Sequence, residues 1–421
     1  MRILFILHQF FPEFSGGTEH VAFNLARMAQ KAGHHVHVLA STVDPVRSGG
    51  IPVGRPFSGS LRTNYQGIPV TVIPRAMLPP AADIGLETGP SMVAALAQWM
   101  DDERFDVAHV LHTMRMGSAV LAAQRCGLPY VLTLTDFYLP CAQINLVTLG
   151  GAACAGPDEG RRCAQECLAP PWTPDSYSQR YRQAASLITA AAERVAPSAY
   201  VAERYRESFP AVHFRVIPHG IDLIALAAAA GAQRTVPPPT PRGLRLAYVG
   251  GVIPQKGLDV LLRALALLPG QDLTLKVIGG FHGNPGYHRE IRSLAAADAR
   301  VSLIGALKAP EVFAALTEVD LLCLPSLVPE TYSLALHESA AAGVPAIVSD
   351  LGAPAERVAQ WGSGLVVAKG EPRAWAAAIQ SVLDEPSLLG KWKQALPLPL
   401  RVEEEAFFYE SLYRRARRYI G

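Results

Sequence analysis

The sequence predicts an α/β protein built from two doubly wound domains that face each other across a cleft. Three observations lead to this expectation. First, 421 residues are too many for one hydrophobic core, so two or three domains are expected. Second, short apolar strands alternate with helical stretches in both halves, which is typical of parallel sheets covered on both faces. Third, an alanine tract followed by a proline cluster at 223–243 separates the two series as a linker.

The first domain is expected to span residues 1–222. Its predicted strands lie at 2–7, 36–40, 106–111, 129–134 and 214–218, and its predicted helices lie near 19–32, 116–126, 177–191 and 198–208. The Gly- and Pro-rich segment 41–90 predicts loops with one hairpin. The segment 141–170 has little periodicity and predicts an insertion.

The second domain is expected to span residues 244–398. Its strands are predicted in LRLAYVG, LTLKVIG, VSLIG, DLLCLP and PAIVS, and its helices at 257–268, 287–297, 310–317 and after Tyr332. The last segment, 399–421, predicts an amphipathic helix with a basic end that packs back across the domains, with membrane-surface contact as the alternative. Ligands of doubly wound sheets bind at the carboxyl ends of the strands, so the cleft between the domains is the expected site.

Composition and charge exclude several classes of protein. Half of the residues are apolar, 18% are charged and the formal net charge is +2, so no nucleic-acid partner is expected. The apolar start of the chain is short, is interrupted by His8 and Gln9 and precedes no small-residue cleavage site, so it predicts a buried strand and not a signal peptide. No uncharged apolar run reaches the ~18 residues of a membrane span. The sequence therefore indicates a cytoplasmic protein.

Four of the six cysteines, Cys141, Cys154, Cys163 and Cys167, fall within one short window. In a reducing compartment, clustered thiols indicate a metal site more than disulfides. Their spacing differs from the paired C-x-x-C of a zinc ribbon, yet the window supplies the four ligands that tetrahedral zinc takes. Structural zinc is therefore the first interpretation, disulfides are the second and unligated cysteines the third.

The common nucleotide-binding loops are absent from the sequence. Neither G-x-G-x-x-G at the first helix nor G-x-x-x-x-G-K-[ST] occurs, and without any Asp-x-Asp no catalytic metal is expected. Instead, FSGGTEH places Gly16 and Gly17 after the first strand and at the start of a helix. Glycines let a backbone approach a ligand closely, and a helix N-terminus favours anions, so this loop suits a diphosphate. A simple turn is the alternative.

The second domain offers one cation and two carboxylates near the ends of its strands. Lys256 lies just before the helix that follows the first strand, where an ammonium can neutralise phosphate. Glu330 lies in the loop after DLLCLPS, and Glu338 lies just over one turn into the next helix, with Ser333 as its N-cap. The amides of residues 331–334 lie between the two carboxylates. This arrangement suits a sugar and a ribose on either side of a diphosphate, with two solvated glutamates as the alternative.

Several motifs together resemble glycosyltransferase family 4, whose members are retaining enzymes with the GT-B fold of two Rossmann-like domains. The Glu330-x7-Glu338 block followed by SAAAGVPAIVSDLGAPAE looks like the signature of this family. The other motifs follow in the family's order along most of the chain: GGTE, FDVAHVLH, LPYVLTLTD, APSAYVAERY, VIPHGID and QKGLD. The cysteine window also resembles that of a subset of these enzymes, in which four cysteines follow the same strand.

The resemblance implies that a sugar is transferred from a nucleotide-diphosphate sugar with retention at its anomeric carbon. Glu330 would bind the transferred sugar, Glu338 the ribose, and Lys256 would neutralise the leaving diphosphate. Positioning and electrostatic stabilisation would then supply the chemistry without a catalytic metal. The donor-binding set implied by the resemblance is Gly16, Gly17 (diphosphate), Lys256, Gly305, Leu307 (base), Glu330, Thr331, Tyr332, Ser333, Leu334 and Glu338.

Three places depart from the family's usual pattern. Gly251 stands where an arginine is common, Thr135 stands where a histidine is common before Asp136, and Thr331 and Ser333 replace glycines. His112, at the end of another strand, is the nearest substitute for the missing histidine, although a packed side chain is the simpler interpretation. The predicted catalytic set is therefore Glu330, Lys256 and His112.

We expect a glycosyltransferase of polysaccharide or glycoconjugate biosynthesis. Its donor would be a UDP- or GDP-sugar, and its acceptor a glycan, a lipid-linked compound or a small molecule. Two alternatives are a nucleotide-sugar epimerase or hydrolase of the same fold, which generally lacks the Glu-x7-Glu block, and a non-catalytic subunit that binds nucleotide sugar. The basic C-terminal helix and Trp172 permit peripheral contact with the inner face of the membrane.

Overall fold

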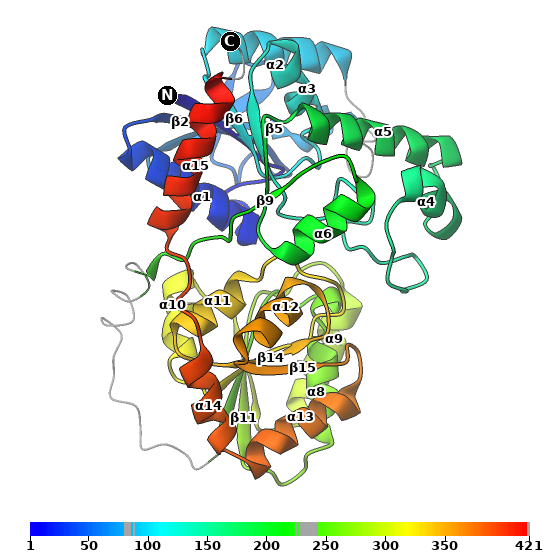
Figure 1. Cartoon of the computed structure of the whole chain (residues 1–421), viewed down its shortest axis with the longest axis vertical. Helices are drawn as coiled ribbons and strands as arrows, with labels where there is room; N and C mark the ends of the chain where they lie inside the picture. Colours follow the sequence, from blue (N-terminus) through cyan, green and yellow to red (C-terminus); the bar gives the residue numbers. More distant parts are fainter. Residues whose placement is uncertain (80–85, 87–88, 224–225, 227–242, 419–421) are drawn as a thin grey trace. The chain divides into compact units, whose positions relative to one another are not determined.

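The computed structural model describes residues 1–79, 86, 89–223, 226 and 243–418 (Figure 1). The chain divides into two compact units: unit 1 comprises Met1–Gly220 and Val402–Gly421, and unit 2 comprises Ile221–Arg401. The predicted linker at 223–243 lies almost entirely outside the described residues. Each unit contains its own sheet and its own hydrophobic core, which confirms the α/β class with two Rossmann-like sheets.

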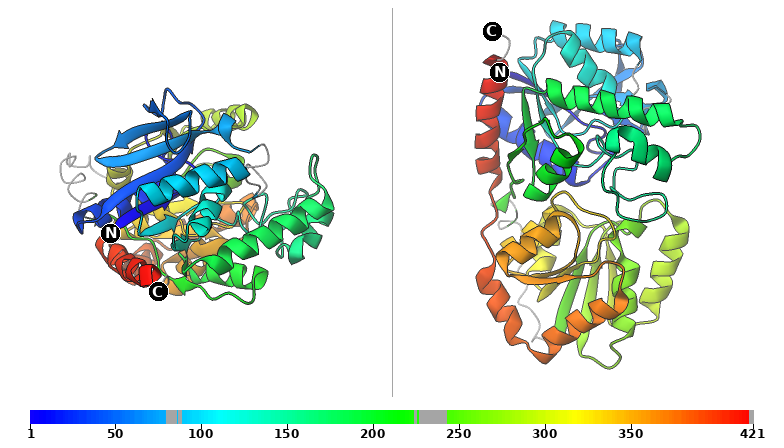
Figure 2. Two further views of the ribbon diagram at one scale, coloured as in Figure 1. Left: turned by 90° about the horizontal axis from the view of Figure 1, so that it is seen from above. Right: turned by 45° about the vertical axis from the view of Figure 1, so that its right-hand side comes forward.

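Unit 1 is built around a mainly parallel sheet. In the described residues its order is β3-β4-β5-β2-β1-β6-β7-β8-β9. The strands are β1 (Arg2–Ile6), β2 (His35–Thr42), β3 (Ile51–Val53), β4 (Ser60–Tyr65), β5 (Ile68–Pro74), β6 (Val107–Val110), β7 (Tyr130–Thr133), β8 (Glu193–Ala196) and β9 (Arg215–Val216). The parallel strands β1, β6 and β7 are neighbours and are almost fully buried, because helices pack on both faces (Figure 2). The loops after these three strands therefore share one edge of the sheet.

The segment 41–90 is more regular than the predicted loops with one hairpin. β3 pairs antiparallel with β4, β4 pairs antiparallel with β5, and β5 joins the main sheet by pairing in parallel with β2. Between β4 and β5, Gln66 and Gly67 both have positive φ, the geometry that matches the twist of a tight hairpin. The run IPVTVIP carries the β-branched residues of a strand, but the glycines and prolines around it concealed this sheet extension.

The helices of unit 1 lie between these strands, and the last helix of the chain joins them. They are α1 (Gly17–Lys31), α2 (Pro90–Asp102), α3 (Gly117–Arg125), α4 (Arg161–Glu166), α5 (Pro174–Ala190), α6 (Ala199–Ser208) and α15 (Val402–Arg417). α15 packs against α1, β6 and β7. His109 of β6 hydrogen-bonds the Tyr413 hydroxyl at 2.8 Å and Thr133 at 2.8 Å, and burial lowers the pKa of His109 to about 3. A neutral buried histidine thus helps to fix α15 on unit 1.

The basic end of α15 is paired within the same unit. Three arginines of α15 form ion pairs at 2.7–3.2 Å: Arg414 with Glu410, Arg415 with Glu193, and Arg417 with Asp106. Across the described part of the chain, no helix combines the length and the apolar character that a membrane span requires.

Unit 2 contains a parallel sheet with the order β12-β11-β10-β13-β14-β15 in the described residues. The strands are β10 (Leu244–Val249), β11 (Leu273–Ile278), β12 (Val301–Gly305), β13 (Leu321–Leu324), β14 (Ala346–Ser349) and β15 (Gly364–Val367). The helices are α8 (Leu258–Ala266), α9 (Pro285–Ala296), α10 (Ala309–Leu316), α11 (Leu334–Ala341), α12 (Gly352–Trp361), α13 (Pro372–Asp384) and α14 (Ser387–Ala395). Because all strands run in parallel, the loops after β10, β12 and β13 lie at one edge, where ligands of doubly wound sheets bind.

Candidate functional site

The central feature of the candidate site is an ion pair between two loops of unit 2. The Lys256 Nζ lies 2.9 Å from the Glu330 Oε1. Lys256 ends the short 3-10 turn Pro254–Lys256 after β10, and Glu330 lies in the loop after β13, the neighbouring strand. The structure therefore brings together two residues that the sequence predicted to act on the same donor.

Two glycines allow these loops to approach each other closely. Gly257 has a φ of 64°, and a Cβ at this position would lie 2.1 Å from the Pro325 carbonyl oxygen. Gly352, at the start of α12, has a φ of 68°, and a Cβ there would lie 2.5 Å from the Glu330 amide nitrogen. The Glu330 carbonyl in turn accepts the Ala353 N–H at 2.9 Å. The backbone that carries Glu330 is thus fixed by the entrance of α12.

The pKa of the Glu330 carboxyl is lowered by its neighbours. Burial alone would raise this pKa, but the Lys256 charge and hydrogen bonds from Ser326, Lys256 and Ser333 outweigh burial. The Ser326 hydroxyl donates to Glu330 Oε1. Ser326 was not predicted, although its position just after β13 places it in the same loop. Glu330 is therefore a charged, oriented hydrogen-bond acceptor at neutral pH.

Glu338 has a different environment, although it belongs to the same segment. It is the fifth residue of α11, as predicted, and the described residues provide no hydrogen bond or ion pair to its side-chain carboxyl. Burial raises its pKa to about 7. A carboxyl that is crowded by protein yet lacks a partner can gain one from a bound polyol.

The N-terminus of α11 lies between the two carboxylates. Ser333 occupies the N-cap position, as predicted, with a φ of 72°, but its side chain makes no capping hydrogen bond. It hydrogen-bonds Glu330 instead. The ring of Tyr332 is buried and stacks on His337 at 4.0 Å, so it supports the turn from inside. Thr331 and Leu334 flank these residues at the same helix entrance.

The remaining predicted donor residues of unit 2 follow neighbouring strands. Gly305 ends β12 with a φ of 88°, and Leu307 lies two residues further on. Both lie at the carboxyl edge of the sheet that also carries Lys256 and Glu330. Gly251, which stands where the family pattern commonly has an arginine, lies in the loop after β10. Its carbonyl accepts a hydrogen bond from the Tyr248 hydroxyl at 2.8 Å, which holds this loop.

In unit 1, the predicted glycine loop opens α1. Gly16 is the N-cap and Gly17 is the first residue of the helix. The Gly16 N–H donates to Glu19 Oε2 at 2.7 Å, and a Cβ on Gly16 would lie 2.6 Å from the same oxygen. Glu19 is buried, and burial raises its pKa above the usual range. The Gly16 amide thus already has a protein partner, a feature that the GGTE motif did not reveal.

Three polar side chains meet at the carboxyl ends of β1, β6 and β7. His112 Nε2 lies 3.1 Å from Asp136 Oδ2, and His112 Nδ1 accepts the Met114 N–H at 3.2 Å. The ring of His8 lies 3.9 Å from that of His112, measured between centroids. Burial lowers the pKa of His112, and the Asp136 charge offsets this only in part. Sequence reasoning identified His112 but gave no role to Asp136 or His8.

The four clustered cysteines remain reduced. All of them are free thiols, and burial followed by the neighbouring thiols of Cys141, Cys154 and Cys167 raises the pKa of Cys163 to about 12. Among the described residues, however, no group of three or more His, Cys, Asp or Glu side chains is placed so that it could hold a metal ion. The thiols thus interact electrostatically, but as placed they do not fit a metal site.

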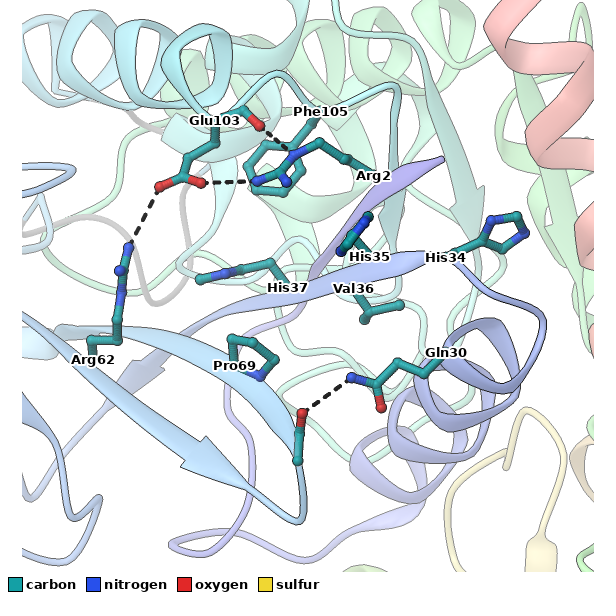
Figure 3. Close-up of a pocket in the computed structure, with 11 residues that line it drawn as sticks. Arg2, Gln30, His34, His35, Val36, His37, Arg62, Pro69, Glu103 and Phe105 are labelled. Carbon is teal, nitrogen blue, oxygen red and sulfur yellow. Dashed lines mark hydrogen bonds and ion pairs between the residues drawn. The ribbon is translucent and has the colours of Figure 1, made fainter.

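A hollow of about 350 Å³ lies at the opposite, amino-terminal edge of the unit 1 sheet (Figure 3). Arg2 and Arg62 both pair with Glu103, at 3.1 Å and 3.5 Å, and close one side of it. These ion pairs link β1 and β4 to the loop before β6. Because ligands of doubly wound sheets bind at the other edge, we assign this hollow no part in the reaction.

The structure therefore gathers the predicted residues in two groups. Lys256, Glu330, Glu338 and the α11 entrance belong to unit 2, whereas the glycine loop and His112 belong to unit 1. The expected cleft between the domains stays a prediction.

Comparison with known proteins matches both halves of the chain. The model of Glycosyltransferase Family 4 matches residues 15–224, and that of Glycosyl transferases group 1 matches residues 234–397. The D-inositol 3-phosphate glycosyltransferase of Jonesia denitrificans is 31% identical over 186 residues, which are 41% of this chain and 44% of that protein. The matched part thus spans less than half the length of this curated relative.

Solved structures resemble the chain over almost its whole length. Sucrose-phosphate synthase from Thermosynechococcus elongatus has a TM-score of 0.71 and 21% identity, with 98% of each chain covered. Anabaena HepE, solved in complex with UDP and glucose, has a TM-score of 0.68 and 16% identity, again with 98% of each chain covered. At these identities the likeness establishes the fold.

Proposed function

We propose that this chain, which carries the paired domains of a GT-B glycosyltransferase with a family 4 region followed by a group 1 region, transfers a sugar from a nucleotide-diphosphate sugar with retention. The acceptor would be a glycan, a lipid-linked compound or a small molecule. Polysaccharide or glycoconjugate biosynthesis is the proposed setting.

The observation that carries this proposal is the Lys256–Glu330 ion pair at the carboxyl edge of the unit 2 sheet. It joins a cation suited to phosphate with a charged carboxylate suited to sugar hydroxyls, 2.9 Å apart. In a nucleotide-diphosphate sugar, the phosphate that Lys256 would bind is bonded directly to the sugar whose hydroxyls Glu330 would bind. When the bond between sugar and diphosphate breaks, Lys256 can stabilise the charge that develops on the leaving oxygen.

The other residues of unit 2 complete the proposed donor site. Glu338 would bind the ribose hydroxyls, the amides at the entrance of α11 would bind phosphate, and the backbone of Gly305 and Leu307 would contact the base. Gly16 and Gly17 of unit 1 stay proposed diphosphate contacts, and the Gly16 N–H would first have to leave Glu19 Oε2. The UDP and glucose bound to Anabaena HepE favour a uridine donor, with GDP-sugars as the alternative.

No catalytic metal enters this proposal, because the sequence contains no Asp-x-Asp to hold one. Structural zinc at the four cysteines is a separate proposal, which rests on their spacing in the sequence and is independent of the reaction; the placement of the thiols does not support it. We further propose a cytoplasmic location, since all six cysteines are free thiols. Peripheral contact with the inner face of the membrane is also proposed, and two exposed aromatic residues of α15, Phe407 and Phe408, support it.

The proposal is tested by screening the purified chain against UDP-, GDP- and ADP-sugars. Thermal shift would report donor binding, and release of nucleoside diphosphate would report turnover with water, glucose and D-inositol 3-phosphate. Formation of a glycoside with the donor's anomeric configuration is the expected result. Release of free sugar alone favours a hydrolase, and interconversion of the sugar favours an epimerase. Binding without any release of nucleoside diphosphate would identify a non-catalytic subunit.

A further inference from the structure

The hollow at the amino-terminal edge of the unit 1 sheet takes no part in the proposed transfer reaction (Figure 3). Its volume of about 350 Å³ lies at the lower end of the range for small-molecule sites, roughly 300–1,000 Å³. Its walls come from the starts of β1 and β2, the end of α1, the β4–β5 hairpin and the loop before β6. All of these elements belong to unit 1, so the hollow is formed within that unit.

Positive charge exceeds negative charge in the lining of the hollow. Arg2 and Arg62 are its permanent cations, and Glu103 is its acidic residue. The Glu103 carboxylate is shared between them: Oε2 lies 3.1 Å from Arg2 Nη2, and Oε1 lies 3.5 Å from Arg62 Nη2. Two positive charges against one negative charge leave this triad with a net charge of +1. The hollow therefore favours an anionic ligand.

The two guanidinium groups retain hydrogen-bond donors for such a ligand. Each guanidinium has five N–H donors. Arg2 donates from Nε to the Glu103 carbonyl at 2.6 Å and from Nη2 to its carboxylate at 3.1 Å. Among the described residues, the guanidinium of Arg62 has the single ion pair at 3.5 Å and no hydrogen bond. The two side chains are 41% and 48% exposed, so both are accessible to a phosphate group, whose oxygens match the guanidinium fork.

His37 adds an uncharged polar group to the wall. It is 9% exposed, and its Nε2 lies 2.8 Å from the Thr71 hydroxyl oxygen, whereas its Nδ1 has no hydrogen-bond partner among the described residues. Burial, followed by the charges of Arg62 and Arg2, lowers the pKa of His37 to about 4, so the ring is neutral at pH 7. A buried nitrogen without a partner gains a hydrogen bond when a ligand or water reaches it.

A second uncharged group and an aromatic ring complete the lining. The Gln30 Nε2 donates to the Gly67 carbonyl at 3.1 Å, which leaves the Gln30 amide oxygen as an acceptor. The Phe105 ring lies 5.9 Å from Arg2 Cζ and 6.1 Å from the His37 ring, measured to the centroids, so it supports both side chains. Cations for a phosphate and neutral partners for hydroxyls thus surround one hollow.

From this geometry we infer that the hollow binds a small phosphorylated polyol. Arg2 and Arg62 hold the phosphate, while His37 and Gln30 hydrogen-bond hydroxyl groups of the ligand. The inference goes beyond the proposed function and does not depend on it, because no residue of the hollow belongs to the donor site. The alternative is a purely structural ion-pair cluster that fastens β1 and β4 to the loop before β6.

Calorimetric titration of the purified full chain at low ionic strength tests the inference. The probes are D-ribose 5-phosphate, inorganic phosphate and D-ribose. We expect saturable binding of ribose 5-phosphate, weaker binding of phosphate and no binding of ribose. Arg62→Gln should raise the Kd for ribose 5-phosphate about fivefold or more, because the phosphate loses one guanidinium. Arg55→Gln changes an exposed arginine of the same unit that pairs with Asp102, and it should leave this Kd unchanged.

Glu103→Gln separates a binding site from a structural cluster. In a binding site the Glu103 charge competes with the ligand for both arginines, so its removal should lower the Kd about threefold or more. In a structural cluster the same substitution removes two ion pairs and provides no binding. A variant that is merely less well folded would bind more weakly, so the expected gain cannot come from damage to the fold.

Four outcomes would overturn the inference. The first is a wild-type protein that shows no saturable binding of ribose 5-phosphate. The second is an unchanged Kd in Arg62→Gln, and the third is weaker binding in Glu103→Gln. The fourth is an equal loss of binding in Lys256→Met, which would place the ligand in the donor site of unit 2. Failure of the donor screen, in contrast, would contradict the proposed function and leave this site unaffected.

Discussion

The carboxyl edges of the two sheets differ in how the chain supplies their polar residues. In unit 2, Glu330 and Glu338 belong to one short segment, and Lys256, which pairs with Glu330, comes from the loop of an adjacent strand. In unit 1, His8, His112 and Asp136 come from three loops that lie far apart in the sequence. Two carboxylates on one segment leave one compact motif in the sequence, whereas residues from three strand ends are divided among separate stretches, so the sequence does not show that they meet.

The two glutamates of unit 2 show the same contrast on a smaller scale. Glu330 has a cation and hydroxyl donors beside it, and these lower its pKa. Glu338 is buried without such neighbours, and burial raises its pKa to about 7. The same residue type in one motif is thus ionised at neutral pH at one position, while at the other its pKa lies at about 7.

The largest expected effect comes from Glu330→Ala. It removes the sugar-binding carboxylate and leaves Lys256 without its ion-pair partner, so we expect kcat/KM to fall by about 100-fold or more. Nucleoside diphosphate release over a range of donor concentrations is the measurement. The matched control is Glu318→Ala, which breaks the exposed Lys276–Glu318 pair at 2.6 Å in the same unit. Turnover of Glu330→Ala equal to that of the control would remove Glu330 from the site.

A somewhat smaller loss is expected from Lys256→Met, which keeps the length of the side chain but removes its charge. The leaving diphosphate then lacks one cation, and turnover should fall about 10- to 100-fold. The pKa of Glu330 should also rise, because the Lys256 charge helps to hold it down. At saturating donor, the variant's rate should therefore fall more steeply than that of wild type as the pH is lowered. A flat profile in both proteins would contradict the coupling.

Glu338→Gln should produce a moderate, pH-dependent effect. The folded protein raises the pKa of this carboxyl from 4.5 to about 7, so the stability it contributes is present below pH 4.5 and is lost as pH rises through 7. The glutamine variant should therefore gain stability over wild type at pH 8, by at most roughly 3 kcal/mol, and gain none at pH 4.5. Thermal unfolding at both pH values measures this. Equal differences would contradict the raised pKa.

Donor binding should also depend on the ionisation of Glu338, but it should become stronger as the pH rises. A ribose that hydrogen-bonds the charged carboxylate favours its ionised form, so the wild-type affinity for UDP should rise a few-fold from pH 6 to pH 8. Glu338→Gln should abolish this dependence. Calorimetric titration at the two pH values is the measurement, and an unchanged slope in the variant would assign the dependence to another group.

The smallest expected effect on turnover concerns the four cysteines of unit 1. If they hold zinc, metal analysis of the purified chain should find about one equivalent, and Cys163→Ser should lower both metal content and thermal stability without changing donor affinity. Cys126→Ser, outside the cluster, is the control. A preparation without bound metal would remove the zinc proposal and leave four reduced thiols.

Much of the fold was readable from the sequence because parallel strands and their helices leave periodic apolar runs. The same runs located Lys256, Glu330 and Glu338, since residues just after buried strands lie at a predictable edge. The sheet extension β3–β5 was missed, because glycines and prolines interrupt its pattern. Asp136 was named only as the neighbour of a missing histidine, and Ser326 was not named at all.

By itself, the sequence determined the α/β class and the two sheets and predicted a charged ligand surface at 329–338, because strand periodicity and helix entrances are local properties. Only the tertiary structure decided which charges meet. It places Lys256 beside Glu330 and His112 beside Asp136, whereas Glu338 is buried without a charged partner. The physical reason is that a pKa and a hydrogen bond depend on the distance between side chains, and the folded chain alone sets that distance.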